Sequence, residues 1–252
     1  MSFCLTIFNY FFISFTMIKN NFNSPIGVFD SGVGGITVLN ELKRVLPNEN
    51  YIYLGDNKNT PYGNKSKPEL LALVKDNINM LLKYGVKAVV LGCNTLSVCL
   101  IEEIKKEFST PIFGVFPPIN KEKKTLLLAT KRTSEKFENS KKLTVYACND
   151  FAYDIEQNIF SLEKVKLKEH IKLSGIFDEI VLGCTHYSFL KKEIEKTFNL
   201  KTTSGEVNTA NLLKEYLIKN NLLSKCHMPK VYFIGDCFLK NMKVYHKYKN
   251  DL

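Results

Sequence analysis

Two distant segments of the chain repeat the same order of residues. In AVVLGCNTLS (88–97) and in EIVLGCTHYS (179–188), an apolar run ends in Gly-Cys and hydroxyl-bearing residues follow. A local repeat of this kind predicts two similar half-domains that face each other. Open parallel sheets bind their ligands beyond the carboxyl ends of their strands. We therefore expect Cys93 and Cys184, which follow such strand ends, to share one ligand site.

The rest of the chain alternates between apolar runs and amphipathic stretches, which is the pattern of an α/β protein with mostly parallel sheets. We expect strands at 26–30, 50–56, 88–94, 111–116, 125–130, 142–148, 179–185 and 231–237. Helices are expected at 36–46, 68–84, 96–107, 151–160 and about 188–198, where apolar residues recur on one helical face. The late strand at 231–237 should return to the first sheet, so that the fold consists of two doubly wound units.

The formal net charge of +10, from 35 Lys and Arg against 25 Asp and Glu, raises the question of a nucleic-acid or anionic membrane partner. Almost all the basic residues are lysines scattered at helix-like intervals, and only Arg44 and Arg132 are arginines. A nucleic-acid surface usually clusters arginines among stacking aromatic side chains. The sequence therefore favours a protein that binds no nucleic acid.

The first 16 residues, MSFCLTIFNYFFISFT, are apolar and uncharged. They are shorter than the about 20 residues that a membrane-spanning helix needs, and they lack the basic start and the cleavage site of a signal peptide. We expect residues 1–16 to be an extension outside the fold, without stable membrane insertion. The seven cysteines include no CxxC pair, so the default for this chain is free thiols in a reducing cytoplasm.

The position of each repeated cysteine suggests an activated thiol. A VLGC sequence ends a strand, its glycine permits an unusual backbone angle, and its cysteine lies at the start of a helix. The N-terminus of a helix lowers the pKa of a thiol towards the physiological range. A buried structural role is the alternative for either cysteine alone, but two equivalent frames favour a functional pair. Cys148 has no such frame and is more typical of a core residue.

Asp30 ends the first strand in FDSGVGG. The glycine-rich turn lacks the GxGxxG order of a dinucleotide site and the lysine of a P-loop. We interpret it as presenting backbone N–H groups and Ser31 to a carboxylate ligand, although a helix cap is another interpretation of Asp30. His186 follows Cys184 closely enough to stabilise its thiolate or to exchange a proton with it. A zinc site would need further ligands at compatible spacing, and none is evident.

Four motifs in this order resemble the glutamate racemases of the Asp/Glu racemase superfamily, namely IGVFDSGVGG (26–35), YLGD with PYGNKS (53–66), CNT (93–95) and LGCTHY (182–187). The resemblance covers roughly residues 25–215. It implies two α/β domains related by pseudo-two-fold symmetry, with the active site between them and no cofactor. The implied first domain comprises residues 24–116 and about 210–245, and the second, shortened domain comprises residues 117–209.

The resemblance also implies a role for each residue that matches a motif. Cys93 and Cys184 would be the two acid/base residues. Asp30 would assist Cys93. Glu156, on the helix after Cys148, and His186 would assist Cys184. The implied substrate-binding residues are Asp30, Ser31, Pro61, Tyr62, Gly63, Asn94, Thr95, Thr130, Thr133, Thr185 and His186. No metal is implied.

The implied reaction is the interconversion of L- and D-glutamate by the two thiols, which supplies D-glutamate for peptidoglycan in a bacterial cytoplasm. The implied assembly is a homodimer.

The sequence departs from the family's pattern at two places in the second domain. The family's cysteine-proline is Cys148–Asn149 here, and INKEKKT (119–125) replaces a glycine-rich segment. The alternatives are an aspartate or related amino-acid racemase with the same thiol pair, and a catalytically impaired binding protein on the same fold.

Overall fold

The computed structural model of the chain describes residues 21–250 and contains two separate sheets. The first has the order β4-β3-β1-β2-β9 and the second has the order β6-β5-β7-β8. Every strand pairing in both sheets is parallel, which confirms the predicted fold class. The predicted extension at residues 1–16 lies outside the described residues.

The first sheet comprises β1 (Ile26–Asp30), β2 (Tyr51–Gly55), β3 (Ala88–Leu91), β4 (Ile112–Gly114) and β9 (Val231–Ile234). Its late strand β9 pairs with β2, so the chain does return to this sheet near its end. Successive residues of a strand face opposite sides of the sheet. Val28 of β1 accordingly packs into one apolar cluster and Phe29 into another, because the sheet is covered on both faces.

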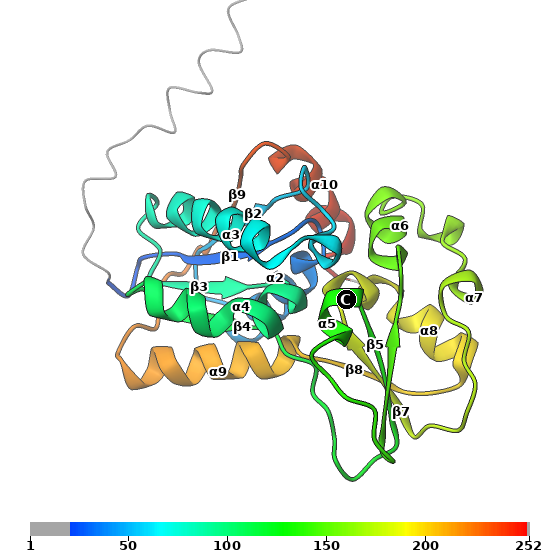
Figure 1. The fold of residues 1–252 in the computed structure, drawn as a ribbon. Coiled ribbons are helices and arrows are strands. Elements are labelled where there is room, and N and C mark those ends of the chain that lie inside the picture. The colour runs from blue at the N-terminus through cyan, green and yellow to red at the C-terminus, as the bar shows by residue number, and fades with distance from the viewer. Residues whose placement is uncertain (1–20, 251–252) are drawn as a thin grey trace, which may run out of the picture.

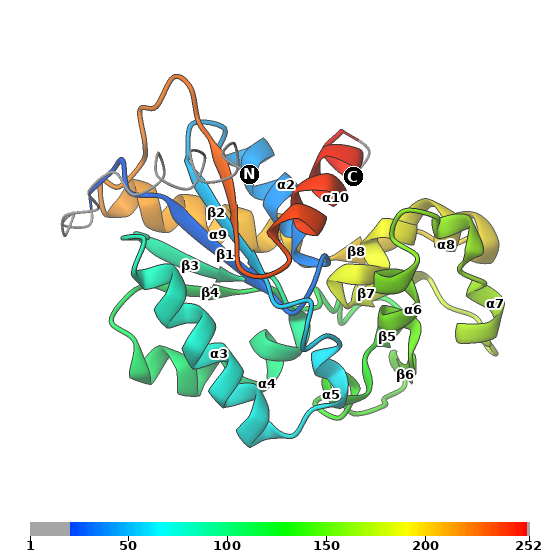
Figure 2. The ribbon, with the colours of Figure 1, turned by 90° about the horizontal axis from the view of Figure 1, so that it is seen from above.

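The covering helices of the first sheet are α2 (Gly35–Val45), α3 (Lys67–Leu82), α4 (Asn94–Glu107), α9 (Glu206–Lys219) and α10 (Phe238–Tyr248). The helices α2, α9 and α10 lie on one face, and α3 and α4 lie on the other (Figure 2). A capping box at Ser66 and Glu69 fixes the start of α3. We call this sheet with its five helices the first half.

The second sheet comprises β5 (Thr125–Ala129), β6 (Leu143–Ala147), β7 (Glu179–Gly183) and β8 (Thr202–Ser204). Around it lie α5 (Lys131–Ser134), α6 (Phe151–Gln157), α7 (Leu167–His170) and α8 (Lys191–Phe198). We call this sheet with these helices the second half. The two halves lie side by side (Figure 1), and one apolar cluster runs through both, with Leu39 from α2 and Ile155 from α6 among its members.

Short 3-10 helices occupy three connections: η1 (Tyr62–Asn64), η2 (Leu162–Lys164) and η3 (Thr185–Leu190). The helix expected at about 188–198 therefore differs in its first turns, because η3 carries residues 185–190 and the α-helix α8 begins only at Lys191. The side chains of η3 are all buried against α2 and α6. The tight turn thus places His186 inside the molecule.

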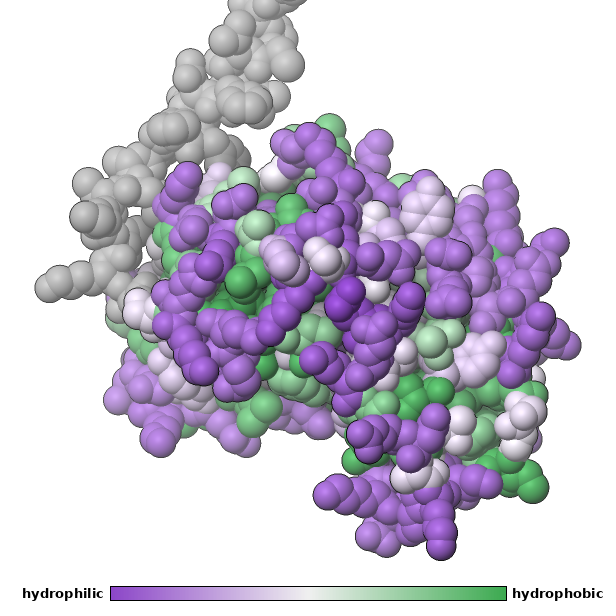
Figure 3. All heavy atoms as spheres, in the orientation of Figure 1, coloured by the Kyte–Doolittle hydropathy of each residue, from purple (hydrophilic) through white to green (hydrophobic). Residues whose placement is uncertain are grey.

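Hydrophilic side chains cover most of the face seen in Figure 3, with apolar ones visible between them. Across residues 21–250, no helix has both the length and the apolar character that crossing a membrane requires.

Candidate active site

Cys93 and Cys184 occupy equivalent places in the two halves. Cys93 follows β3, which pairs with the first strand of its sheet, and Cys184 follows β7, which pairs with β5. Each cysteine is the N-cap residue of the helix that comes next, α4 or η3. Both side chains are more than nine-tenths buried. The structure therefore places each repeated thiol after the carboxyl end of an interior strand of its sheet, and the two thiols are near enough to interact electrostatically.

The pKa of the Cys93 thiol is raised well above its usual range, in the first place by burial. Electrostatic interactions with Asp30 and with Cys184 raise it further, whereas hydrogen bonds from the Leu96 backbone and the Ser31 side chain lower it. The expectation that the start of a helix lowers this pKa is therefore wrong in net effect. The donors at the helix start are present, but burial outweighs them. At neutral pH, Cys93 is a protonated thiol.

Asp30 lies at the end of β1, between the two halves, and is fully buried. Its Oδ1 accepts a hydrogen bond from the Gly32 backbone N–H at 2.7 Å, and its Oδ2 accepts one from the Thr185 hydroxyl at 3.3 Å. Burial raises the pKa of Asp30 to about 6, although the charge of His186 and the Gly32 hydrogen bond act against it. The carboxyl group therefore contacts the second half directly and titrates close to neutral pH.

His186 is buried beside Cys184. Its Nδ1 lies 3.9 Å from the Sγ of Cys184, and its Nε2 lies 2.8 Å from the Oε2 of Glu156. Burial lowers the pKa of His186, but hydrogen bonds to Cys184 and Glu156 outweigh burial and raise it well above its usual value. An ionised carboxylate can only accept hydrogen bonds, so the Nε2–H group donates to Glu156. The other ring nitrogen is thereby directed at the thiol.

Glu156 lies on α6 and its side chain is inaccessible to solvent. Besides His186, its Oε2 accepts a hydrogen bond from the Val33 backbone N–H at 2.9 Å. Its Oε1 accepts one from Asn57 Nδ2 at 2.7 Å and one from Lys240 Nζ at 2.6 Å. Burial alone would raise the pKa of Glu156, but His186 and Lys240 lower it to about 2. The carboxylate is therefore an anion at all physiological pH values.

The glycine-rich turn after β1 is required for space around these groups. A Cβ on Gly32 would lie 2.5 Å from Glu156 Oε2. A Cβ on Gly34 would lie 2.5 Å from Thr185 Oγ1 and 2.6 Å from His186 Nδ1. Gly34 has φ −55°, an angle that every residue type adopts. A glycine is thus needed at position 34 because the second half approaches closely, and not because the backbone is strained.

Three threonine hydroxyls meet across the boundary between the halves. Thr95 Oγ1, in the first turn of α4, lies 3.1 Å from Thr130 Oγ1 and 3.2 Å from Thr133 Oγ1. Thr130 and Thr133, which flank the start of α5, lie 3.1 Å from each other. A Cβ on Gly63 would come within 2.8 Å of the Thr130 Cβ. The structure therefore gathers hydroxyl donors from both halves beside the backbone of Gly63.

The remaining residues of the predicted site also lie near this boundary, but two of them bind protein groups. Tyr62 donates its hydroxyl hydrogen to Asp56 at 2.6 Å, and Asn94 Nδ2 donates to the Val115 carbonyl at 3.1 Å. Pro61 lines a small hollow. These contacts fix the walls of the site.

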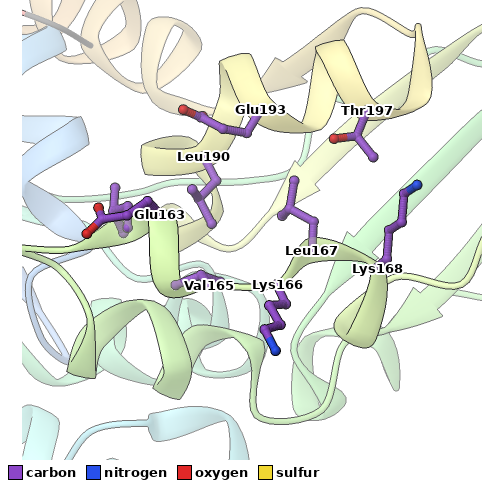
Figure 4. A pocket seen from close by; sticks show the side chains of 9 residues that line it. Glu163, Val165, Lys166, Leu167, Lys168, Leu190, Glu193 and Thr197 are labelled. Carbon is purple, nitrogen blue, oxygen red and sulfur yellow. The ribbon is translucent and has the colours of Figure 1, made fainter.

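The hollow between the halves is lined by Pro61, Gly63, Thr130 and Cys148, among others, and has a volume of about 10 Å³. That volume holds about one water molecule, and neither Cys93 nor Cys184 lines this hollow. A second cavity, of about 400 Å³, lies between α8 and the segment that contains η2 and α7 (Figure 4). No residue of the predicted site lines this second cavity.

Of the four groups that hold Glu156, the sequence predicted only His186, and the Val33 N–H belongs to the turn that was expected to bind a ligand carboxylate instead. Asn57 follows the YLGD motif directly, so the motif could have drawn attention to it. Lys240 belongs to α10, 84 positions after Glu156 in the sequence, and nothing distinguishes it from the other lysines. Within residues 21–250, no group of three or more His, Cys, Asp or Glu side chains is arranged to hold a metal ion.

Known proteins resemble this chain over most of its length. A glutamate racemase of Clostridium novyi (strain NT) is 36% identical to it, over 79% of this chain and 86% of that protein. The crystal structure of the glutamate racemase isoform RacE1 from Bacillus anthracis is 28% identical, covers 90% of this chain and 92% of its own, and superposes with a TM-score of 0.75.

A third relative is the crystal structure of glutamate racemase from Francisella tularensis in complex with D-glutamate, which is 27% identical, covers 91% of this chain and 96% of its own, and has a TM-score of 0.73. No protein-family model matches the chain. The identity to the Clostridium protein extends over both halves and includes most of that protein. The chain belongs to the glutamate racemase family.

Proposed function

We propose that this protein interconverts L- and D-glutamate by transferring protons between the Cα of the substrate and the thiols of Cys93 and Cys184. The observation that carries the proposal is the placement of the two buried thiols after the carboxyl ends of β3 and β7, one in each half, where they interact electrostatically. The relatives named above are glutamate racemases, which supports glutamate as the substrate. In this family the product D-glutamate serves peptidoglycan synthesis.

Inversion at Cα requires the removal of a proton from one face and the addition of a proton to the other. A single base would have to cross the substrate between these steps, whereas two opposed groups need not move. In the L-to-D direction, the Cys184 thiolate takes the Cα proton and the Cys93 thiol donates its proton to the opposite face. The substrate gains and loses one proton, and Cys93 ends as the thiolate. The reverse reaction exchanges the two roles.

The protonation states of the ligand-free site fit one half of this scheme. Cys93 is a thiol, since burial raises its pKa well above the usual range, and it can therefore act as the acid. To act as the base it must lose this proton. We propose that the ammonium group of bound glutamate favours that loss, because a nearby positive charge lowers the pKa of a thiol. Asp30 would assist Cys93 by attracting the same ammonium group.

At the other thiol, we propose that His186 stabilises the thiolate of Cys184 and that Glu156 orients His186. The distances of 3.9 Å and 2.8 Å between these groups support this order of contacts. The imidazolium charge lies next to the sulfur, where it favours the anionic form. Cys184 and Cys93 would thus be activated by different means, one by a fixed protein cation and one by the substrate.

The substrate-binding role falls to the hydroxyl groups and backbone N–H groups that line the boundary between the halves. Thr95, Thr130 and Thr133 would donate to one carboxylate of glutamate, since their oxygens already lie within 3.2 Å of one another. Ser31, Asn94 and Thr185 would hold the other end. Fixed donors in a site without bulk water stabilise the carbanion-like transition state.

The chain divides most simply into a first domain of residues 24–116 and about 210–245 and a second domain of residues 117–209. The membership of β8 in the second sheet and the packing of α9 against α2 support this division. We propose that the domains separate to admit glutamate, because Cys93, Cys184 and Asp30 at the boundary between them are buried. The connections that would bend are the two chain crossings near Phe116 and Gly205.

We further propose a homodimer in the cytoplasm. Exposed apolar side chains on α9, among them Leu212 and Ile218, support an assembly that covers them. The six cysteines of the described residues are free thiols, which supports a reducing compartment. Light scattering of the purified protein measures the mass, and a monomer at micromolar concentration would contradict the dimer.

Circular dichroism tests the proposed reaction directly, because the signal of L-glutamate decays to zero as D-glutamate forms. Decay with L-glutamate and a much slower change with L-aspartate is the expected result. Faster turnover of aspartate would identify the enzyme as an aspartate racemase. If neither enantiomer of glutamate incorporates deuterium at Cα in D₂O, the protein is a binding protein and the proposal is wrong.

A further inference from the structure

The carboxylate of Glu156 belongs to the second half, but three of its four hydrogen-bond donors belong to the first. Among residues 21–250, His186 is the only donor to this carboxylate from its own half. The other three are the backbone of Val33 before α2, the amide of Asn57 after β2, and the ammonium of Lys240 on α10. Glu156 is therefore held in place from across the boundary between the halves.

Lys240 is the one of these three donors that carries a charge. Its Nζ lies 2.6 Å from Glu156 Oε1 and 3.3 Å from the backbone carbonyl of the same residue. The Lys240 side chain is one-third exposed, whereas that of Glu156 is inaccessible. A buried carboxylate needs a charged or hydrogen-bonding partner, and Lys240 reaches from the surface to supply it.

The same helix makes two more contacts with the turn that follows α6. Lys247 Nζ donates to the Phe160 carbonyl at 2.8 Å, and the Tyr248 hydroxyl donates to the Ile159 carbonyl at 2.6 Å. Carbonyl groups at the C-terminal end of a helix lack partners in the helix and attract cations. α10 is thus attached to α6 and to the turn after it, and of these donors only Lys240 also contacts the Glu156 side chain.

We propose that Lys240 is a positioning residue for the Cys184 side of the reaction, which it serves by fixing the carboxylate that orients His186. The proposal rests on the role of Cys184 given above. Without Lys240, the Oε1 atom keeps only the neutral Asn57 amide, and the carboxylate gains freedom to turn. His186 then loses its fixed direction towards Cys184. The Cys93 side should be unaffected, since Asp30 is held by Gly32 and Thr185 instead.

Two substitutions separate positioning from simple attachment of α10. Lys240→Met keeps the length of the side chain and removes its charge, and Lys240→Arg keeps the charge. Lys247→Ala is the matched control, because it removes a hydrogen bond between α10 and the turn after α6 without changing any contact of the Glu156 side chain. The first readout is the imidazole NMR signal of His186, which is one of only four histidines in the chain.

The second readout is hydrogen exchange at Cα in D₂O, measured separately for each thiol. A Cys93→Ser enzyme leaves only Cys184 to exchange L-glutamate, and a Cys184→Ser enzyme leaves only Cys93 to exchange D-glutamate. Adding Lys240→Met should slow the first exchange about tenfold, because a hydrogen bond to a charged group is lost. The second exchange should not change. Lys240→Arg should restore most of the first exchange.

We expect the His186 signal to move in Lys240→Met and to stay in place in Lys247→Ala. An unmoved His186 signal together with undiminished L-glutamate exchange would overturn the proposal. Equal losses in Lys247→Ala and Lys240→Met would also overturn it, since Lys240 would then only attach the helix. If neither single-thiol enzyme exchanges its substrate, the proposed reaction is wrong, and the His186 signal alone still decides the positioning role.

Discussion

Glu156 Oε2 lies 2.8 Å from His186 Nε2, and this contact joins helix α6 to the 3-10 turn that follows Cys184. Both side chains are buried. Because the carboxylate is saturated with donors, it holds the imidazole in one orientation, with Nδ1 towards the sulfur of Cys184.

Replacing Glu156 by Gln should lower kcat about tenfold or more, because the amide removes the charge that stabilises the His186 imidazolium. The measurement is kcat and KM for L- and D-glutamate. Glu163→Gln is the control, since Glu163 is an exposed acid at the rim of the cavity in Figure 4. Equal activity of Glu156→Gln and the parent would show that His186 needs no carboxylate.

Asp30→Asn should stabilise the folded protein at pH 7–8 while it lowers activity. The pKa of Asp30 rises from 3.8 to about 6 on folding, which corresponds to a cost of up to ~3 kcal/mol for the ionised form. A raised carboxyl pKa means that the folded state loses stability as pH increases from about 4 to 6. Thermal unfolding should therefore show a higher Tm for Asp30→Asn at pH 7–8 and no advantage at pH 4. A lower Tm at pH 8 would contradict the buried charge.

The pH dependence of kcat/KM should also report the ionisation of Asp30. This ratio reports the ionisations of the free enzyme, and burial raises the pKa of Asp30 to about 6. Activity should fall below about pH 6 as Asp30 becomes protonated, and this acid limb should be absent from the residual activity of Asp30→Asn. If the acid limb persists in Asp30→Asn, it is due to another ionisable group.

Gly34→Ala should impair catalysis by steric clash alone. Its Cβ would lie 2.5 Å from Thr185 Oγ1 and 2.6 Å from His186 Nδ1, so that both side chains must shift. We expect kcat/KM to drop at least about tenfold, since small displacements of catalytic groups are costly. Gly27→Ala is the control, because its Cβ would meet only flexible ends of core side chains, 3.1 Å from Leu81. It should cost stability but little activity.

The sequence predicts each strand of the described residues except β8 (Thr202–Ser204), because the others are short apolar runs that end in a turn signal, whereas β8 is short and polar. IGVFD is buried over its whole length, and its two faces pack into different clusters. The turn after Cys184 was predicted less well. Residues 185–190 form a 3-10 helix whose side chains are all buried, and the apolar pattern of an α-helix does not distinguish that conformation.

The pKa of the Cys93 thiol and the contacts between residues distant in the sequence could not be predicted from the sequence. The helix start at Cys93 predicts a lowered thiol pKa, but the opposite holds, because burial depends on packing by both halves. Lys240 contacts Glu156 across 84 positions of the sequence. A single lysine among 35 basic residues carries no local signal of such a role.

The requirement for two thiols is tested most directly by racemisation in single serine variants. Cys93→Ser and Cys184→Ser should each lower the rate of L-to-D conversion at least about a hundredfold, the minimum expected for a lost general acid or base. Cys99→Ser, which changes a half-buried thiol on α4, should leave the rate unchanged. Racemisation at the parental rate by either Cys93→Ser or Cys184→Ser would contradict the two-thiol account.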